Sequence, residues 1–177
     1  LGMFITFLPL YAHLQGLEIA QIGVVFSAQG LTNALSRLPF GYLSDMVRDR
    51  RLLVMAGLCG FAVALAGFAL SRSLAPFLLF AVILGLGMGL AFTSVGALIP
   101  EAVPTESLGL AMGGYNSCIY LGMMLSSACM GPVIRLTGFE SGFLLTALLN
   151  FFVMAGFQAL MKGFTPKRGT GPPKPSS

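Results

Sequence analysis

The sequence has 177 residues, of which 56% are hydrophobic and 9% are charged, and its net charge is +4. A soluble domain carries about 25% charged residues, so this composition excludes a water-soluble globular fold. The apolar stretches are about 20 residues long, which indicates membrane-spanning α-helices rather than the shorter alternating strands of a β-barrel.

Six apolar spans follow one another, joined by short polar loops. They cover residues 1–14, 19–44, 52–70, 75–99, 109–134 and 142–161. The first span is shorter than a bilayer requires and has no initiator Met, so we expect it to be truncated. Short loops make consecutive helices antiparallel neighbours, which predicts a six-helix bundle over residues 1–163. Residues 164–177 are polar and rich in Pro and Gly, which predicts a disordered cytoplasmic tail.

Basic residues are distributed unevenly between the two faces of the membrane. One face carries Arg48, Arg50, Arg51, Lys162, Lys167, Arg168 and Lys174, whereas the other carries Arg72 and Arg135. Lys and Arg accumulate on the cytoplasmic side of membrane proteins. We therefore expect a multi-pass protein of the cell (inner or plasma) membrane with both ends of the segment in the cytoplasm. The basic residues are scattered, so we expect no nucleic-acid partner, and the lipid bilayer is the first partner.

Small residues recur every fourth position on three spans. The sets are Ala56, Gly60 and Ala64; Gly85 and Gly89; and Gly109, Gly113 and Ser117. Such stripes allow helix backbones to approach closely in lipid. We expect packing within the bundle, and a homodimer interface is the alternative.

A Gly and an Asp one helical turn apart end the second span, and a cluster of charges follows them. Gly41 would allow a neighbouring helix to approach, and Asp45 would face the positive N-terminus of another helix. We interpret this region as a conformational latch between two rigid units, and a plain cytoplasmic loop is the alternative. The residues of the predicted latch are Gly41, Asp45, Arg48, Arg50, Arg51 and Glu101.

A polar stripe precedes the latch on the same helix face. It consists of Gln29, Asn33, Arg37, Gly41 and Asp45. Arg37 would lie about 12 Å deeper in the membrane than Asp45, where a guanidinium costs a few kcal/mol unless it is paired or faces water. Arg37 is therefore a candidate for anion binding or gating, and a snorkelling or structurally paired Arg is the alternative.

The sequence around Gly41 and Asp45 resembles a motif of the major facilitator superfamily of secondary transporters. The superfamily's loop between the second and third helices of each half reads roughly G-x-x-x-D-[R/K]-x-G-[R/K]-[R/K]. The matching residues are Gly41, Asp45, Arg50 and Arg51, and the departures are Met46, Arg48 and Asp49. Residues 7–11 with 21–23, residues 99–106, and Gly131-Pro132 also resemble superfamily segments in the same order.

The resemblance implies six transmembrane helices in a 3+3 inverted repeat, forming half of a twelve-helix transporter. We favour the C-terminal half, with the first half as the alternative, so the missing half is an expected partner. In this superfamily the first and fourth helices of a half line the central cavity. Thr6 and Thr93 lie on those two spans, and Asn116 and Tyr120 on the fifth span could join them. With Gln29, Asn33 and Arg37 of the polar stripe, they form the predicted substrate pathway.

The implied function is secondary transport of a small solute, a drug-like molecule or metabolite that is exported, by alternating access. If protons drive transport, the titrating carboxylate lies in the missing half, because no span has Asp or Glu at its middle. A non-transporting scaffold or sensor is the alternative. With one histidine, His13, and no nucleophile motif or metal-ligand spacing, we expect neither an enzyme nor a metal or cofactor.

Overall fold

The computed structural model of the chain describes residues 1–47 and 50–162, except for the side chains of Asp45, Arg50, Glu101, Phe157 and residues 160–162. Within this part the chain forms six α-helices and a short 3₁₀ helix. They are α1 (Gly2–Leu14), α2 (Ile19–Met46), α3 (Arg50–Leu70), α4 (Leu74–Ala102), η1 (Thr105–Ser107), α5 (Leu108–Thr137) and α6 (Phe139–Lys162). The prediction of an all-helical chain with six helices is confirmed. The predicted tail, residues 164–177, lies outside the described residues.

Four of the helices in the described part are long and apolar enough to cross a membrane, namely α3, α4, α5 and α6. The other two helices, α1 and α2, do not meet this criterion, and each fails it for a different reason. α1 has only 13 residues, whereas α2 has 28 residues but carries polar side chains such as Gln29, Asn33 and Arg37. The prediction of membrane-spanning helices is therefore confirmed for four segments and stays a prediction for α1 and α2.

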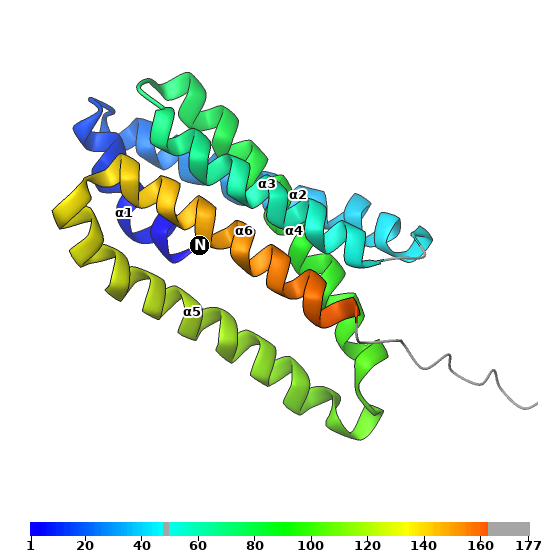
Figure 1. Cartoon of the computed structure of the whole chain (residues 1–177). Coiled ribbons are helices and arrows are strands. Elements are labelled where there is room, and N and C mark those ends of the chain that lie inside the picture. The colour runs from blue at the N-terminus through cyan, green and yellow to red at the C-terminus, as the bar shows by residue number, and fades with distance from the viewer. Residues whose placement is uncertain (48–49, 163–177) are drawn as a thin grey trace, which may run out of the picture.

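The helices run antiparallel in sequence order, so the turns gather at two opposite ends of the bundle (Figure 1). The Arg72 end holds residues 15–18, 71–73 and 138. The Asp45 end holds the end of α2 at residues 45–47, the start of α3 at Arg50, and residues 103–107. α2, α3, α4 and α6 lie alongside one another, whereas α5 lies to one side and α1 sits between α5 and the rest (Figure 1). The predicted antiparallel order is confirmed. The expectation that consecutive helices are neighbours is wrong for α2 and α3, because both pack mainly against α4 rather than against each other. The internal 3+3 repeat stays a prediction.

The turn between α5 and α6 is tighter than predicted. We expected a loop over residues 135–141, but only Gly138 separates the two helices. Gly138 has a φ of 86°, in the region that side chains disfavour, and its amide donates a hydrogen bond to the Ile134 carbonyl. A single glycine thus reverses the chain. At the other end, α4 continues through Pro100 to Ala102, three residues beyond the predicted span.

Glycines set the distance between α2 and α4. A Cβ atom at Gly85 would lie 2.6 Å from the Gln29 carbonyl oxygen, and one at Gly89 would overlap the Ser36 hydroxyl. The predicted role of Gly85 and Gly89 in close helix packing is confirmed, because these backbones could not approach with a side chain between them.

The same prediction is wrong for α5 within the described chain. A Cβ atom at Gly109 or Gly113 would meet no atom within 4 Å there, and Ser117 is exposed. In α3, Gly60 contacts Gly87, and Ala64 is buried, but Ala56 is exposed. We did not predict another close α3–α4 contact, in which Gly57 packs against Gly87 and Ala91.

Aromatic side chains fill the core near the Arg72 end. Phe68 lies 5.5 Å from Phe4, 6.1 Å from Phe77 and 6.2 Å from Phe143 between ring centroids, and all four are fully buried. Tilted and offset aromatic pairs each add about 0.5–1.5 kcal/mol beyond burial of area. This core joins α1, α3, α4 and α6 at one end of the bundle.

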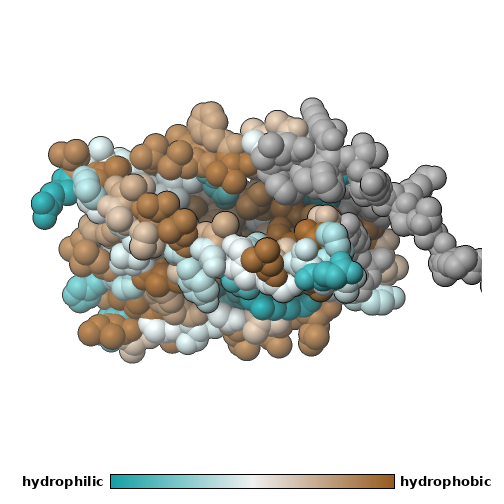
Figure 2. Space-filling view, turned by 90° about the horizontal axis from the view of Figure 1, so that it is seen from below, coloured by the Kyte–Doolittle hydropathy of each residue, from teal (hydrophilic) through white to brown (hydrophobic). Residues whose placement is uncertain are grey.

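The outer surface is strongly apolar. Exposed hydrophobic side chains include Leu31, Leu35 and Leu38 on α2 and Phe152 on α6. Figure 2 shows brown hydrophobic residues over much of one face. A water-soluble monomer rarely exposes apolar patches of this extent, whereas lipid tails cover such a surface without cost.

Candidate functional site

A groove of about 390 Å³ lies where α2, α4 and α5 meet the start of α1. We name it the Arg37 groove. Its lining residues are Leu1, Arg37, Phe92, Tyr115, Asn116, Ile119, Tyr120 and Met123. Three predicted pathway residues, Arg37, Asn116 and Tyr120, therefore come together from two helices that are far apart in sequence. The lining also includes Tyr115, beside the predicted Asn116, and the unpredicted ring of Phe92.

Asn33 holds Arg37 in place. The Arg37 Nε donates a hydrogen bond to Asn33 Oδ1 at 3.2 Å, across one turn of α2. Residues four apart share a helix face, which is why the polar stripe brings these two side chains together. The Arg37 guanidinium also lies within electrostatic range of the Tyr115 hydroxyl on α5.

The α5 side chains add neutral polar groups. Asn116 Nδ2 donates to the Met112 carbonyl of its own helix at 3.0 Å, which leaves the amide oxygen as its acceptor for other groups. The Tyr120 side chain is 70% exposed. The groove thus offers one guanidinium, one amide and two phenol rings beside apolar walls.

The other predicted pathway residues lie away from this groove. Gln29 is buried between α2 and α4, where its Nε2 donates to the Met88 sulfur at 3.1 Å. Thr93 donates to the Gly89 carbonyl of its own helix at 2.6 Å. Thr6 shares a hydrogen bond of 2.8 Å with Ser127, which links α1 to α5. The structure therefore gives these three side chains contacts within and between helices.

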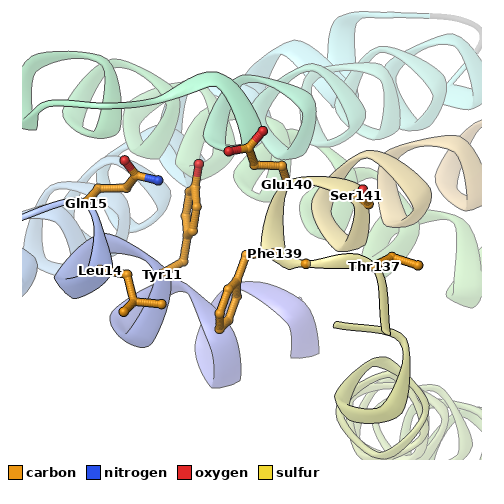
Figure 3. Close-up of a pocket in the computed structure, with 8 residues that line it drawn as sticks. Tyr11, Leu14, Gln15, Thr137, Phe139, Glu140 and Ser141 are labelled. Carbon is orange, nitrogen blue, oxygen red and sulfur yellow. The ribbon is translucent and has the colours of Figure 1, made fainter. Parts of the chain in front are cut away.

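A second pocket, of about 340 Å³, lies at the Arg72 end between α1 and the α5–α6 turn. Figure 3 shows the Gln15 amide and the Glu140 carboxylate on either side of the Tyr11 hydroxyl. The Tyr11 hydroxyl is buried and donates to the Ala69 carbonyl at 3.0 Å. Glu140 forms an ion pair of 2.6 Å with Arg72. Tyr11 and Glu140 already have partners, so these contacts tie α1 and α6 to the end of α3 rather than present a free binding site.

Sequence reasoning missed this polar cluster. Arg72 entered only the count of basic residues, and Glu140 lies 68 positions further along the chain. Arg72 lies in the turn between α3 and α4, and Glu140 lies in the first turn of α6, so no spacing along one helix connects them. The available signal was the topology, which places both residues on the same face of the membrane.

A family model with the description "Major Facilitator Superfamily" matches residues 1–177 of the chain. The chain belongs to this superfamily. The resemblance that the sequence motifs indicated is therefore confirmed, and the family and the apolar helices indicate a multi-pass membrane protein.

Curated superfamily relatives are similar over most of the chain. The chain is 29% identical over 160 residues to "Probable anion transporter 6, chloroplastic" of Arabidopsis thaliana, covering 90% of this chain and 31% of the relative. It is 33% identical over 141 residues to "Inner membrane transport protein YajR" of Escherichia coli (strain K12), covering 76% and 29%. It is 29% identical over 155 residues to "Multidrug resistance protein MdtG" of Dickeya zeae (strain Ech586), covering 85% and 38%. The chain thus spans about a third of the length of these superfamily relatives.

The residues of the predicted superfamily latch lie at the Asp45 end. Asp45 is in the last turn of α2, Arg50 and Arg51 begin α3, and Glu101 is near the end of α4. Arg48 lies outside the described residues, as do the side chains of Asp45, Arg50 and Glu101. The contacts of the latch therefore stay a prediction.

Gly41 is a latch residue with a described contact to α4. A Cβ atom there would lie 3.8 Å from Thr93 Cγ2, an ordinary van der Waals distance. Within the described chain, no helix approaches Gly41 unusually closely, and its predicted role in the latch stays a prediction. The close approach of α2 and α4 occurs at Gly85 and Gly89 instead.

Proposed function

We propose that this chain is one six-helix half, the C-terminal half, of a secondary active transporter that moves a small solute across the cell membrane. The observation that carries the proposal is the superfamily match over residues 1–177. The coverage of about a third of each relative supports assignment as a portion of a longer transporter. The N-terminal half is the alternative position.

The proposed mechanism is alternating access. Two six-helix units, each a 3+3 inverted repeat, rock about a site near the middle of the membrane. The Arg37 groove supports a role for this chain in that site, because it gathers Arg37, Asn116 and Tyr120 between α2, α4 and α5. The exported solute is a metabolite or a drug-like molecule. The relatives' names, which include an anion transporter and a multidrug resistance protein, support this breadth.

The proposed latch closes the cytoplasmic side in the outward-facing state. Asp45 faces a helix N-terminus, and the basic residues Arg48, Arg50 and Arg51 pair with carboxylates that include Glu101. The backbone positions of Asp45, Arg50, Arg51 and Glu101 at one end of the bundle support this arrangement. The bias of Lys and Arg toward that face supports a cytoplasmic location for both ends of the chain.

Transport by the full-length protein in proteoliposomes, with and without a pH gradient, tests the proposal. We expect Asp45→Asn and Arg37→Ala each to reduce the rate at least about tenfold, because each removes a charge from the latch or the groove. Glu106→Gln and Arg135→Ala are matched controls, since both residues are exposed and lie outside the latch and the groove. A rate that depends on the pH gradient supports proton coupling, whereas an unchanged rate supports facilitated diffusion.

The competing function is a non-transporting scaffold or sensor with the same fold. It predicts no solute uptake above protein-free liposomes and no loss of function in Asp45→Asn. Unchanged rates in both Asp45→Asn and Arg37→Ala, with wild-type uptake intact, would contradict the assigned roles of these two residues.

A further inference from the structure

Arg37 has hydrogen-bond donors that the described chain does not use. A guanidinium carries five N–H donors, and the bond to Asn33 Oδ1 takes the one on Nε. The remaining four lie on the two Nη atoms, arranged as a planar fork. Such a fork matches two oxygens of a carboxylate or a sulfonate in a bidentate contact. The Asn33 contact restrains the side chain, so less conformational entropy is lost when an anion binds.

The described part of the chain supplies no countercharge for Arg37. Its carboxylate side chains are those of Glu18, Glu106 and Glu140, and none of these lines the Arg37 groove or forms an ion pair with Arg37. An unpaired Arg within a membrane helix is costly to insert, because a guanidinium loses its hydration there. An anion in the groove would offset that cost.

The uncharged side chains in the groove indicate the shape and polarity of the rest of the anion. Phe92, Tyr115 and Tyr120 supply three aromatic rings, and Asn116 supplies an amide. Rings of this kind pack against a flat, apolar body. The volume of about 390 Å³ falls within the range of about 300–1,000 Å³ typical of small-molecule sites.

Arg37 is the one charged side chain that the described chain contributes to the groove, which favours a ligand with one negative charge. One guanidinium neutralises one carboxylate or sulfonate, and a second negative group would remain unpaired in a medium of low dielectric constant. A cationic ligand would face Arg37 directly and be repelled.

We infer that the Arg37 groove binds an organic monoanion, with one carboxylate or sulfonate on the Arg37 fork and a flat, uncharged body against Tyr115, Tyr120 and Phe92. This assignment rests on the proposed transport function and names the substrate class of the same site.

The test compares anions with neutral molecules of the same shape. Purified full-length protein is titrated with benzoate, phenylacetate and benzenesulfonate, each beside its amide, and with the dianion phthalate, while thermal stabilisation is followed. Uptake of the same radiolabelled probes is measured in proteoliposomes. We expect at least one monoanion to bind about tenfold or more tightly than its amide and than phthalate, as a charge-assisted bidentate contact predicts.

Variants at Arg37 separate charge from geometry. Arg37→Gln is expected to abolish the preference for the anion while leaving the affinity for the amide within about twofold. Arg37→Lys is expected to keep part of the preference, since lysine retains the charge but not the fork. Arg135→Gln removes an exposed arginine outside the groove and is expected to behave as wild type.

Three results would overturn the inference. The first is wild-type protein that prefers no monoanion over its amide. The second is folded Arg37→Gln protein, judged by size-exclusion chromatography, with the preference unchanged. The third is Arg37→Gln protein that loses stability while its preference is unchanged, which would assign Arg37 to an ion pair within the full-length protein. Uptake without charge preference overturns only this inference, whereas charge-selective binding without any uptake overturns the proposed transport function.

Discussion

Gly85 of α4 lies so close to Gln29 of α2 that a Cβ atom on Gly85 would be 2.6 Å from the Gln29 carbonyl oxygen. The contact is between two backbones, so no flexible side chain can move aside. It sets the α2–α4 distance, and with it the position of Arg37, which lies two turns further along α2.

Gly85→Ala should therefore destabilise the protein. We expect a loss of about 1–3 kcal/mol from forced separation of the helices, larger than the gain in helix propensity. Gly96→Ala is the matched control, because a Cβ atom on this α4 residue meets nothing within 4 Å. The control should be neutral or stabilising by up to about 1 kcal/mol. Thermal unfolding of the full-length protein in detergent measures the stability of both variants. Equal unfolding midpoints for Gly85→Ala and Gly96→Ala would contradict the close contact at Gly85.

The tight turn at Gly138 gives a second prediction. Its φ of 86° and ψ of 168° belong to a region occupied almost only by glycine. Gly138→Ala should cost about 1–3 kcal/mol, although the space around this residue is open. Gly156→Ala, in α6 with equally open surroundings, should cost nothing. The unfolding midpoints of the two variants provide the comparison, and a Gly138→Ala protein as stable as wild type would refute the strained turn.

The buried hydroxyl of Tyr11 gives a third prediction. It donates to the Ala69 carbonyl at 3.0 Å, linking α1 to α3. Tyr11→Phe should lower stability by about 1–3 kcal/mol, because the buried carbonyl loses its donor. Tyr42→Phe is the control, since the Tyr42 side chain is 70% exposed. Amide hydrogen exchange near Ala69 should increase in Tyr11→Phe and stay unchanged in Tyr42→Phe.

The Arg72–Glu140 ion pair should contribute little despite its length of 2.6 Å. The side chains are 57% and 50% exposed, and exposed pairs contribute about 0.2–1 kcal/mol. A double-mutant cycle with Arg72→Ala and Glu140→Ala should give a coupling energy in that range, decreasing as salt screens the charges. A coupling energy above about 2 kcal/mol, or one insensitive to salt, would show that the pair is shielded from water in the full-length protein.

The spacing of residue types along the sequence correctly predicted the features that depend on a single helix. The long apolar runs predicted the six helices, since a bilayer requires about 20 apolar residues per helix. The four-residue interval between Asn33 and Arg37 predicted their shared face, and the structure adds the hydrogen bond between them. The loop motif indicated the superfamily because its residue types recur at fixed positions.

Features that depend on two helices were predicted only in part. Glycines four apart occur on both α4 and α5, yet Gly85 and Gly89 pack against α2 whereas Gly109 and Gly113 meet no described atom. Gln29, Asn33 and Arg37 belong to one polar stripe, yet Gln29 is buried against Met88 while Arg37 lines a groove. Spacing along one helix cannot show which neighbour faces it, or at what depth.

The sequence by itself determined that this protein is a helical membrane protein of the Major Facilitator Superfamily, because hydropathy and motif spacing are properties of the linear chain. Only the tertiary structure decided which polar residues meet. Arg37 joins Tyr115, Asn116 and Tyr120, and Arg72 joins Glu140, across 68 to 83 positions of sequence. The physical reason is that helix rotation and depth depend on packing between helices, here on glycine contacts such as Gly85 with Gln29.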